Sequence, residues 1–336
     1  MTVPQADCKL APIIIRLPNW VGDVCMTFPS LSALAGTGRP LIMCGRPWSK
    51  DLVAQFAPEQ FVSLTGKFLL DRQAISAIPK HTRQASVGLL LPDSLSSAAL
   101  FALTGIKSAG YRDDGRSLLL RWPIKKSKQS GHAVQKWWRL TQEASKAWGL
   151  NMPGTHGPEL PPVPTNITLT ISDDDQKAAL AAVHRDGLKP HHFILLAPTA
   201  TGTHHGKVKV WPHFAQLAHQ LKSQGLAAAT CPPAHEREQA KQACPTAVLL
   251  DPLPLASFCA LTRLASLVVC NDSGVSHMAA LAGANQLTLF GVTDPANTRP
   301  WSQKALTLGS NGQWPSADGV LRKLHQMLAQ QGEFQP

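Results

Sequence analysis

Short apolar runs alternate with helix-like stretches along most of this chain. Such runs, separated by helical segments, are typical of a parallel sheet that helices cover on both faces. Two series of runs predict strands; they are 13–17, 40–45 and 87–92, followed by 193–198, 226–232, 264–272 and 286–294. The pattern therefore predicts an α/β protein with two doubly wound parallel sheets.

A passage rich in proline and glycine, 151–168, lies between the two series and is interpreted as a linker. A stretch with few breakers, 132–150, precedes it and predicts a helix with one buried face. The resulting domains are 1–160 and 161–336, and the last helix could pack back on the first domain. Open α/β sheets bind ligands at the carboxyl ends of their strands, so we expect functional residues directly after the strands, in a cleft.

Composition agrees with this outline. The length of 336 residues, against about 150 for an average domain, favours two domains. A hydrophobic content of 44% with 16% charged residues excludes a disordered chain. No apolar run reaches the roughly 20 residues that a membrane helix needs, and the first residues lack the pattern of a secretory signal. We expect a soluble protein of the cytoplasm.

Cysteine usage and net charge indicate the state of the thiols and the classes of ligand that the sequence favours. Seven cysteines without zinc-like spacing indicate reduced, mostly buried thiols. A net charge of +11 favours nucleic acid, an anionic membrane face or a phosphorylated substrate. The one basic cluster, 121–128, has no nucleic-acid-binding signature beside it. A phosphate-rich or membrane-bound ligand is therefore favoured over nucleic acid.

The loop after the strand 193–198 contains small and hydroxyl residues, then Lys207 and Lys209, then a Trp-Pro pair that leads into a helix. Hydroxyls, backbone N–H groups and a lysine beside a helix N-terminus suit a diphosphate. An ordinary polar loop before a proline-started helix explains the same residues, so both interpretations stay open. The order of residues excludes a P-loop.

A second loop follows the strand that ends at Asn271. Asp272 and Ser273 are helix-capping types, Gly274 allows close backbone approach, and His277 would lie on the first turn of a small-residue helix. Each residue alone is more often structural. Their combination at one strand end predicts a binding loop.

The first strand leaves through the sequence Arg16 to Asp23, with Asn19 and Trp20 in the loop. Asp23 is a single carboxylate placed where the next helix is expected to begin. It is a candidate helix cap, and Trp20 is more often a packing residue. Pro29 predicts a kink or a late helix start, because proline beyond the first turn removes a hydrogen bond.

Four motifs in this order, PNWVGDVCMTFPSL, KVWPHFAQLA, NDSGVSHMAALAG and LFGVTDP, resemble the ADP-heptose:lipopolysaccharide heptosyltransferases of glycosyltransferase family 9, and most of all the heptosyltransferase II-like members. The resemblance implies a GT-B fold, with two Rossmann-like domains facing across a cleft. It also implies inverting, single-displacement transfer of heptose from ADP-L-glycero-D-manno-heptose to the inner core of lipopolysaccharide.

The resemblance assigns roles by position. Asp23 is implied as the catalytic base. The implied donor-binding residues are Thr199, Thr201, Lys209, Glu236, Asp272, Ser273, Gly274 and His277. Glu236 is only an approximate match, so the nucleoside contacts depart from the family pattern. Asn19, Trp20, Arg112 and Arg116 are the expected acceptor-binding residues.

No cofactor or metal is implied, since no acidic pair lies beside the donor loops. The expected partners are ADP-heptose, the anionic lipopolysaccharide core and the cytoplasmic surface of the inner membrane, with a peripheral, monomeric enzyme and no nucleic acid. The alternatives are a related transferase acting on a protein or another glycan, and a non-catalytic nucleotide-sugar-binding protein. A Rossmann dehydrogenase is disfavoured because no GxGxxG follows a strand.

Overall fold

The computed structural model describes residues 11–127, 131–150, 152, 162–165, 167–204, 206–310 and 312–331. The chain divides into two compact units, Met1–Pro164 and Thr165–Pro336. The expected boundary at 160/161 and most of the linker at 151–168 lie outside the described residues.

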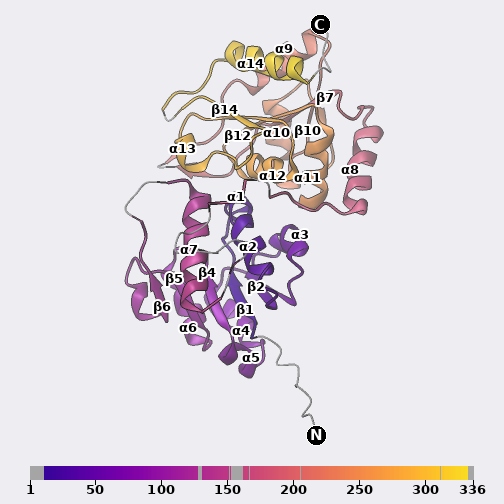
Figure 1. Ribbon diagram of the computed structural model, residues 1–336. Helices are drawn as coiled ribbons and strands as arrows, with labels where there is room; N and C mark the ends of the chain where they lie inside the picture. The colour runs from indigo at the N-terminus through magenta and orange to yellow at the C-terminus, as the bar shows by residue number, and fades with distance from the viewer. Residues whose placement is uncertain are drawn as a thin grey trace. The chain divides into compact units, whose positions relative to one another are not determined.

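The first unit is a six-stranded parallel sheet in the order β3-β2-β1-β4-β5-β6, flanked by helices (Figure 1). Its strands are β1 (Ile13–Arg16), β2 (Leu41–Gly45), β3 (Gln60–Ser63), β4 (Val87–Leu90), β5 (Lys107–Tyr111) and β6 (Trp122–Ile124). Its helices are α1 (Val21–Met26), α2 (Phe28–Ala35), α3 (Ser49–Val53), α4 (Phe68–Ser76), α5 (Lys80–Ala85), α6 (Leu95–Leu103) and α7 (Ala133–Ala147), with short 3₁₀ turns η1 (Ala54–Phe56) and η2 (Arg116–Leu118). The central strand β1 has no exposed isoleucine, because helices cover both of its faces.

The second unit repeats this plan in the order β11-β10-β7-β12-β13-β14. Its strands are β7 (Phe193–Ala197), β10 (Ala227–Thr230), β11 (Val248–Leu249), β12 (Leu267–Asn271), β13 (Gln286–Leu289) and β14 (Ala305–Leu308), and β8 (Thr203–His204) and β9 (Lys207–Val208) form a separate small hairpin. Its helices are α8 (Asp173–Arg185), α9 (Phe214–Ser223), α10 (Arg237–Ala243), α11 (Leu255–Leu264), α12 (Gly274–Ala282), α13 (Pro295–Thr298) and α14 (Ala317–Gln330), with the 3₁₀ turn η3 (Ala234–Glu236).

Both sheets reverse their strand order beside the first strand of the unit. Residues for a ligand collect at such a reversal, because the loops after the two central strands turn to opposite faces of the sheet. The reversal lies between β1 and β4 in the first unit and between β7 and β12 in the second. The predicted loops after 13–17, 193–198 and 264–272 all leave from these central strands.

All seven predicted strands are present, and the helix predicted at 132–150 is α7. Strands β3, β5, β6, β11 and β14 were not predicted, because they are short, partly exposed or, in β5, built largely from small and polar residues. The expected interruption near Pro29 is also confirmed. Helix α1 ends at Met26, and α2 begins with Pro29 in its first turn, where its missing N–H is tolerated.

The last helix, α14, packs its apolar face into the core of the second unit. It lies beside α9 in Figure 1, and Val320, Leu324 and Leu328 are buried against the same cluster as Phe214 and Leu217 of α9. A hydrogen bond of 3.0 Å from the Gln220 amide to Asp318 joins the two helices at the surface.

The six cysteines of the described part, Cys25, Cys44, Cys231, Cys244, Cys259 and Cys270, are buried free thiols, as predicted. Burial raises the pKa of the Cys244 thiol to about 12, so it carries no reactive thiolate at neutral pH. No described helix is long and apolar enough to span a membrane.

Candidate functional site

Asn271, the last residue of β12, joins three segments at the carboxyl edge of the second sheet. Its side chain is fully buried. The amide oxygen accepts a hydrogen bond of 2.9 Å from the Trp211 N–H, and the amide nitrogen donates to the carbonyls of Ala197 and Pro198 at 3.4 and 3.1 Å. The end of β7, the segment before α9 and the loop after β12 are therefore held together by one side chain.

Lys209 and Asp272 form an ion pair next to this junction. The Lys209 Nζ lies 3.0 Å from the Asp272 Oδ2, with 4% of the aspartate side chain and 21% of the lysine side chain exposed. The Thr293 hydroxyl donates to the same oxygen at 2.6 Å. A buried carboxylate is costly without such partners, so Lys209 and Thr293 explain how Asp272 is held at this strand end.

The N-terminus of α12 begins directly after this pair. Ser273 occupies the N-cap position in an extended conformation, yet its side chain caps no helix N–H. The Ser273 Oγ is buried and has no hydrogen-bond partner among the described residues. A helix start without a side-chain cap leaves N–H groups and partial positive charge available, which suits an anion. Gly274 is the first helical residue, and His277 is buried on the first turn.

Thr199 and Glu236 meet on the other side of β7. The Thr199 hydroxyl donates to the Glu236 Oε2 at 2.5 Å, and only 12% of the glutamate side chain is exposed. Thr201 is exposed in the loop that follows Thr199. The approximate sequence match at Glu236 thus places a carboxylate in contact with the strand-end loop, where it can accept hydrogen bonds from ligand hydroxyls.

Asp23 lies in the first turn of α1, in the first unit. The N-cap position belongs to Trp20, whose side chain makes no capping hydrogen bond, so Asp23 does not occupy the N-cap. It is the third helical residue, where a carboxylate is favoured by the helix dipole. The side chain is neither fully buried nor fully exposed.

Buried Arg16 orders the loop that leads to Asp23. Its guanidinium donates to the Asn19 Oδ1 at 2.7 Å and to the Leu17 carbonyl. Burial lowers the pKa of Arg16, although nearby Cys44 and Asp71 oppose that shift. Trp20 is 65% exposed at the tip of the loop, so it does not act as a packing residue within the described part.

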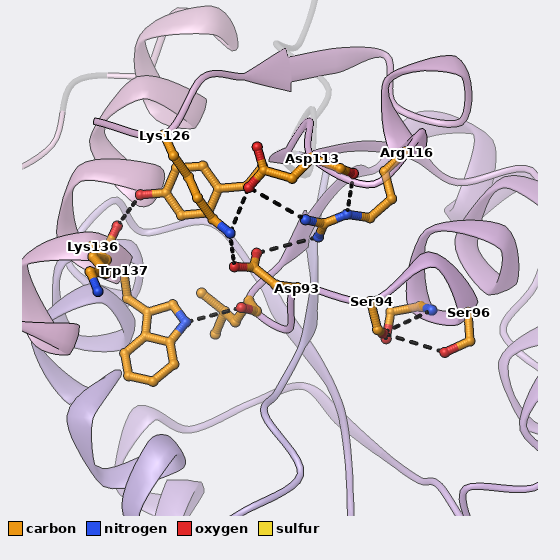
Figure 2. A network of polar contacts seen from close by, with 11 residues as sticks. Asp93, Ser94, Ser96, Asp113, Arg116, Lys126, Lys136 and Trp137 are labelled. Atoms are coloured by element: carbon orange, nitrogen blue, oxygen red, sulfur yellow. Dashed lines mark hydrogen bonds and ion pairs between the residues drawn. The ribbon is translucent and has the colours of Figure 1, made fainter. Parts of the chain in front are cut away.

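Arg116 lies inside a network of ion pairs in the segments that follow β4, β5 and β6 (Figure 2). Only 1% of its side chain is exposed; Nη1 lies 3.3 Å from the Asp93 Oδ1, and Nε donates to the Asp113 carbonyl at 2.9 Å. The Lys126 Nζ bridges the two aspartates at 2.6 Å each. Burial opposes the charge of Lys126, but hydrogen bonds to both carboxylates outweigh it and raise its pKa.

Tyr111 completes the network. The Lys126 ammonium lies 5.5 Å from the centre of its ring, and its hydroxyl donates to the Lys136 carbonyl in α7. Burial raises the pKa of Tyr111, with Asp93 adding to the effect. Arg116 therefore fits a structural role, whereas Arg112 is exposed beside it.

The structure thus brings Lys209 together with Asp272, and Thr199 together with Glu236. Sequence reasoning gave no role to Asn271, Thr293 or Asp93, and it treated Lys126 only as part of the basic cluster 121–128. A signal existed for Asp93, which directly follows the predicted strand 87–92. No group of three or more His, Cys, Asp or Glu side chains in the described part is arranged to hold a metal ion.

Comparison with known proteins identifies the family of this chain. The model of glycosyltransferase family 9 (heptosyltransferase) matches residues 80–326. A curated relative, lipooligosaccharide heptosyltransferase 2 of Haemophilus influenzae, is 29% identical over 314 residues, which cover 87% of each chain.

Two solved structures share the fold. The ADP-heptose lipopolysaccharide heptosyltransferase II of E. coli has a TM-score of 0.74 at 21% identity, with 96% of this chain and 99% of that chain covered. A family 9 glycosyl transferase of Veillonella parvula has a TM-score of 0.76 at 14% identity, with the same coverage. Together with the two six-stranded parallel sheets, they confirm the α/β, GT-B-like fold class.

The network around Arg116 predicts unequal losses of stability for its two cations. Arg116→Met removes a fully buried cation and should lower the free energy of unfolding by about 2–3 kcal/mol, somewhat below the range for a fully buried pair because Asp93 and Asp113 are partly hydrated. Lys126→Met, at a 40% exposed side chain, should cost less than about 1 kcal/mol. Urea unfolding of both variants measures the difference, and equal losses would contradict a buried structural role for Arg116.

Proposed function

We propose that this chain, which belongs to glycosyltransferase family 9 (heptosyltransferase), transfers heptose from ADP-L-glycero-D-manno-heptose to the inner core of lipopolysaccharide. The names of its relatives support the substrates, since they include a lipooligosaccharide heptosyltransferase and an ADP-heptose lipopolysaccharide heptosyltransferase. The observation that carries the proposal is the pairing of Lys209 with Asp272 beside the uncapped start of α12.

The donor's diphosphate binds at this start of α12. Lys209 moves its ammonium from the Asp272 carboxylate toward a phosphate oxygen, while the Ser273 hydroxyl and the first N–H groups of the helix donate hydrogen bonds. Asp272 stays satisfied through Thr293, which donates to the same carboxylate oxygen. Once the donor is bound these groups are in place, so they stabilise the charge that grows on the departing ADP without further reorganisation. His277 faces the same ligand from the helix, and no metal is part of the proposal.

The nucleoside binds beside β7 and β10. Glu236 accepts hydrogen bonds from ribose hydroxyls, with Thr199 holding its carboxylate in place at 2.5 Å. Thr201, exposed in the same loop, adds a hydroxyl on the phosphate side.

Asp23 acts as the general base. The acceptor hydroxyl oxygen forms a bond to the anomeric carbon of heptose, and its proton goes to the Asp23 carboxylate. The bond from the anomeric carbon to the ADP oxygen breaks, and its electron pair leaves with ADP. The attack comes from the face opposite the leaving group, so the configuration inverts in one displacement with no covalent sugar–enzyme intermediate.

The first unit recognises the acceptor. Exposed Trp20, Asn19 and Arg112 contact the anionic core sugars, and Arg116 holds the segment after Arg112 in place through its ion pairs. The net charge of +11 suits both an anionic acceptor and an anionic lipid surface. We further propose that the enzyme works in the cytoplasm, as a monomer bound peripherally to the inner membrane.

Asp23→Asn tests the base. Transfer of heptose to truncated lipopolysaccharide cores, followed by mass spectrometry of the product, should fall by at least about 10²-fold, because an amide cannot accept the proton. Affinity for ADP should stay within about twofold. Asp51→Asn is a matched control, since Asp51 also lies in the first turn of a short helix of this unit. Normal turnover in Asp23→Asn would remove Asp23 from the mechanism.

Lys209→Met tests the diphosphate site. Loss of one charge-assisted hydrogen bond should weaken ADP binding by roughly 10- to 100-fold in calorimetric titration. Lys207→Met is the control, because Lys207 is an exposed lysine two residues away in β9. Equal ADP affinity in the Lys209 variant and wild type would contradict the proposed site.

A further inference from the structure

A short apolar turn, exposed to solvent, projects from the carboxyl edge of the first sheet. It is formed by Thr65–Leu70, which we call the α4 tip, and every residue of it is exposed. Leu69 is 75% exposed, Leu70 48% and Phe68 37%. Three consecutive large apolar side chains facing water are unusual on a protein surface and point to a partner.

Buried polar groups hold this tip in place. The Asp71 carboxylate, 5% exposed, accepts hydrogen bonds from the Thr65 N–H at 2.6 Å, the Thr65 hydroxyl at 3.0 Å and the Gly66 N–H at 3.0 Å. The Arg46 guanidinium donates to the Thr65 carbonyl. It also lies so close to Gly66 that an added Cβ would sit 2.7 Å from it, and Gly66 has a φ of +88°. The apolar side chains are thus presented by an ordered turn.

The tip carries positive charge beside its apolar side chains. Lys67 and Arg72 are both exposed. The only acid between residues 65 and 76 is Asp71, which is buried in the turn below. Apolar side chains flanked by basic ones are the pattern of proteins that bind the interface of anionic membranes.

The place of the tip in the fold fits a surface contact. It follows β3, the outermost strand of the sheet, and all strands of this unit run parallel. The tip therefore lies at the same edge of the sheet as the loop carrying Asp23, which follows β1. Of the nine large apolar side chains exposed in the described part, seven belong to the first unit.

We propose that the α4 tip inserts into the interfacial region of an anionic lipid bilayer, with Phe68, Leu69 and Leu70 among the acyl chains and Lys67 and Arg72 at the headgroups. This rests on the proposed function, in which the acceptor is anchored in a membrane. The tip carries three exposed apolar side chains on one short turn, which suits shallow insertion into lipid. It offers too little surface for a stable protein partner, which buries about 800 Å² on each side.

Sedimentation with vesicles tests the tip without using the reaction. The full chain should bind vesicles of phosphatidylglycerol and phosphatidylcholine and bind pure phosphatidylcholine vesicles much more weakly. Leu69→Ser/Leu70→Ser should lower the partition coefficient on the anionic vesicles by at least about tenfold, because the variant loses the favourable transfer of two leucine side chains from water to lipid. Lys67→Glu/Arg72→Glu should lower it as well, with weaker dependence on salt.

The matched control is Leu103→Ser. Leu103 is 56% exposed but ends α6, at the opposite edge of the sheet, so binding should be unchanged. Near-wild-type vesicle binding by Leu69→Ser/Leu70→Ser, or no vesicle binding by the wild type, would overturn the proposal. All variants are first compared with wild type by thermal unfolding.

A transfer assay with a deacylated, water-soluble acceptor separates the two proposals. The Leu69→Ser/Leu70→Ser variant should keep wild-type kcat/KM on it. A large loss there would make the tip an acceptor-binding site and overturn the lipid contact. Absence of heptose transfer in the wild type, with tip-dependent vesicle binding intact, would contradict the proposed function and leave the lipid contact standing.

Discussion

The second unit depends on one buried amide. The Asn271 amide oxygen accepts a hydrogen bond from the Trp211 N–H, and the amide nitrogen donates to two carbonyls at the end of β7. Three loops that are distant in sequence are therefore held at one junction. Burial of Asn271 makes each of these hydrogen bonds costly to lose, because no water can replace them. Lys209 lies two residues before Trp211 and Asp272 one residue after Asn271, so their ion pair of 3.0 Å follows directly from this junction. The uncapped start of α12 is held beside them for the same reason.

Each unit contains a cation paired with carboxylates, but the two cations differ in their burial and in their number of partners. Lys209 and Asp272 are joined by a single ion pair, with the lysine 21% exposed and able to exchange its partner for a ligand oxygen. Arg116 is instead surrounded by Asp93, Asp113 and Lys126 and has almost no exposed surface. A partly exposed, singly paired cation can bind a ligand. A buried, multiply paired one holds the loops after β4 and β5 in place.

Much of this could be predicted from the sequence, because buried parallel strands are nearly continuous apolar runs. The central strands were found for that reason, while half-exposed edge strands such as β3 and β11 lack such runs. The rule that functional residues follow strands located Lys209, Asp272 and Ser273. Asn271 could not be assigned its role, since its partners lie 60 to 74 residues away and leave no local signal. Arg116 was expected to bind the acceptor, and only the fold shows that Asp93, 23 residues away, pairs with it. The exposure of Phe68, Leu69 and Leu70 likewise has no signal in the sequence, because it depends on the turn that Asp71 holds.

The most direct test of the junction is calorimetric titration of ADP into the wild type and Asn271→Ala. We expect the variant to stay folded, as judged by circular dichroism, and to bind ADP at least about tenfold more weakly, because Lys209 and the start of α12 lose their common support. An unchanged Kd in a folded Asn271→Ala protein would show that these loops hold the donor without the junction, and would contradict the central role given to Asn271.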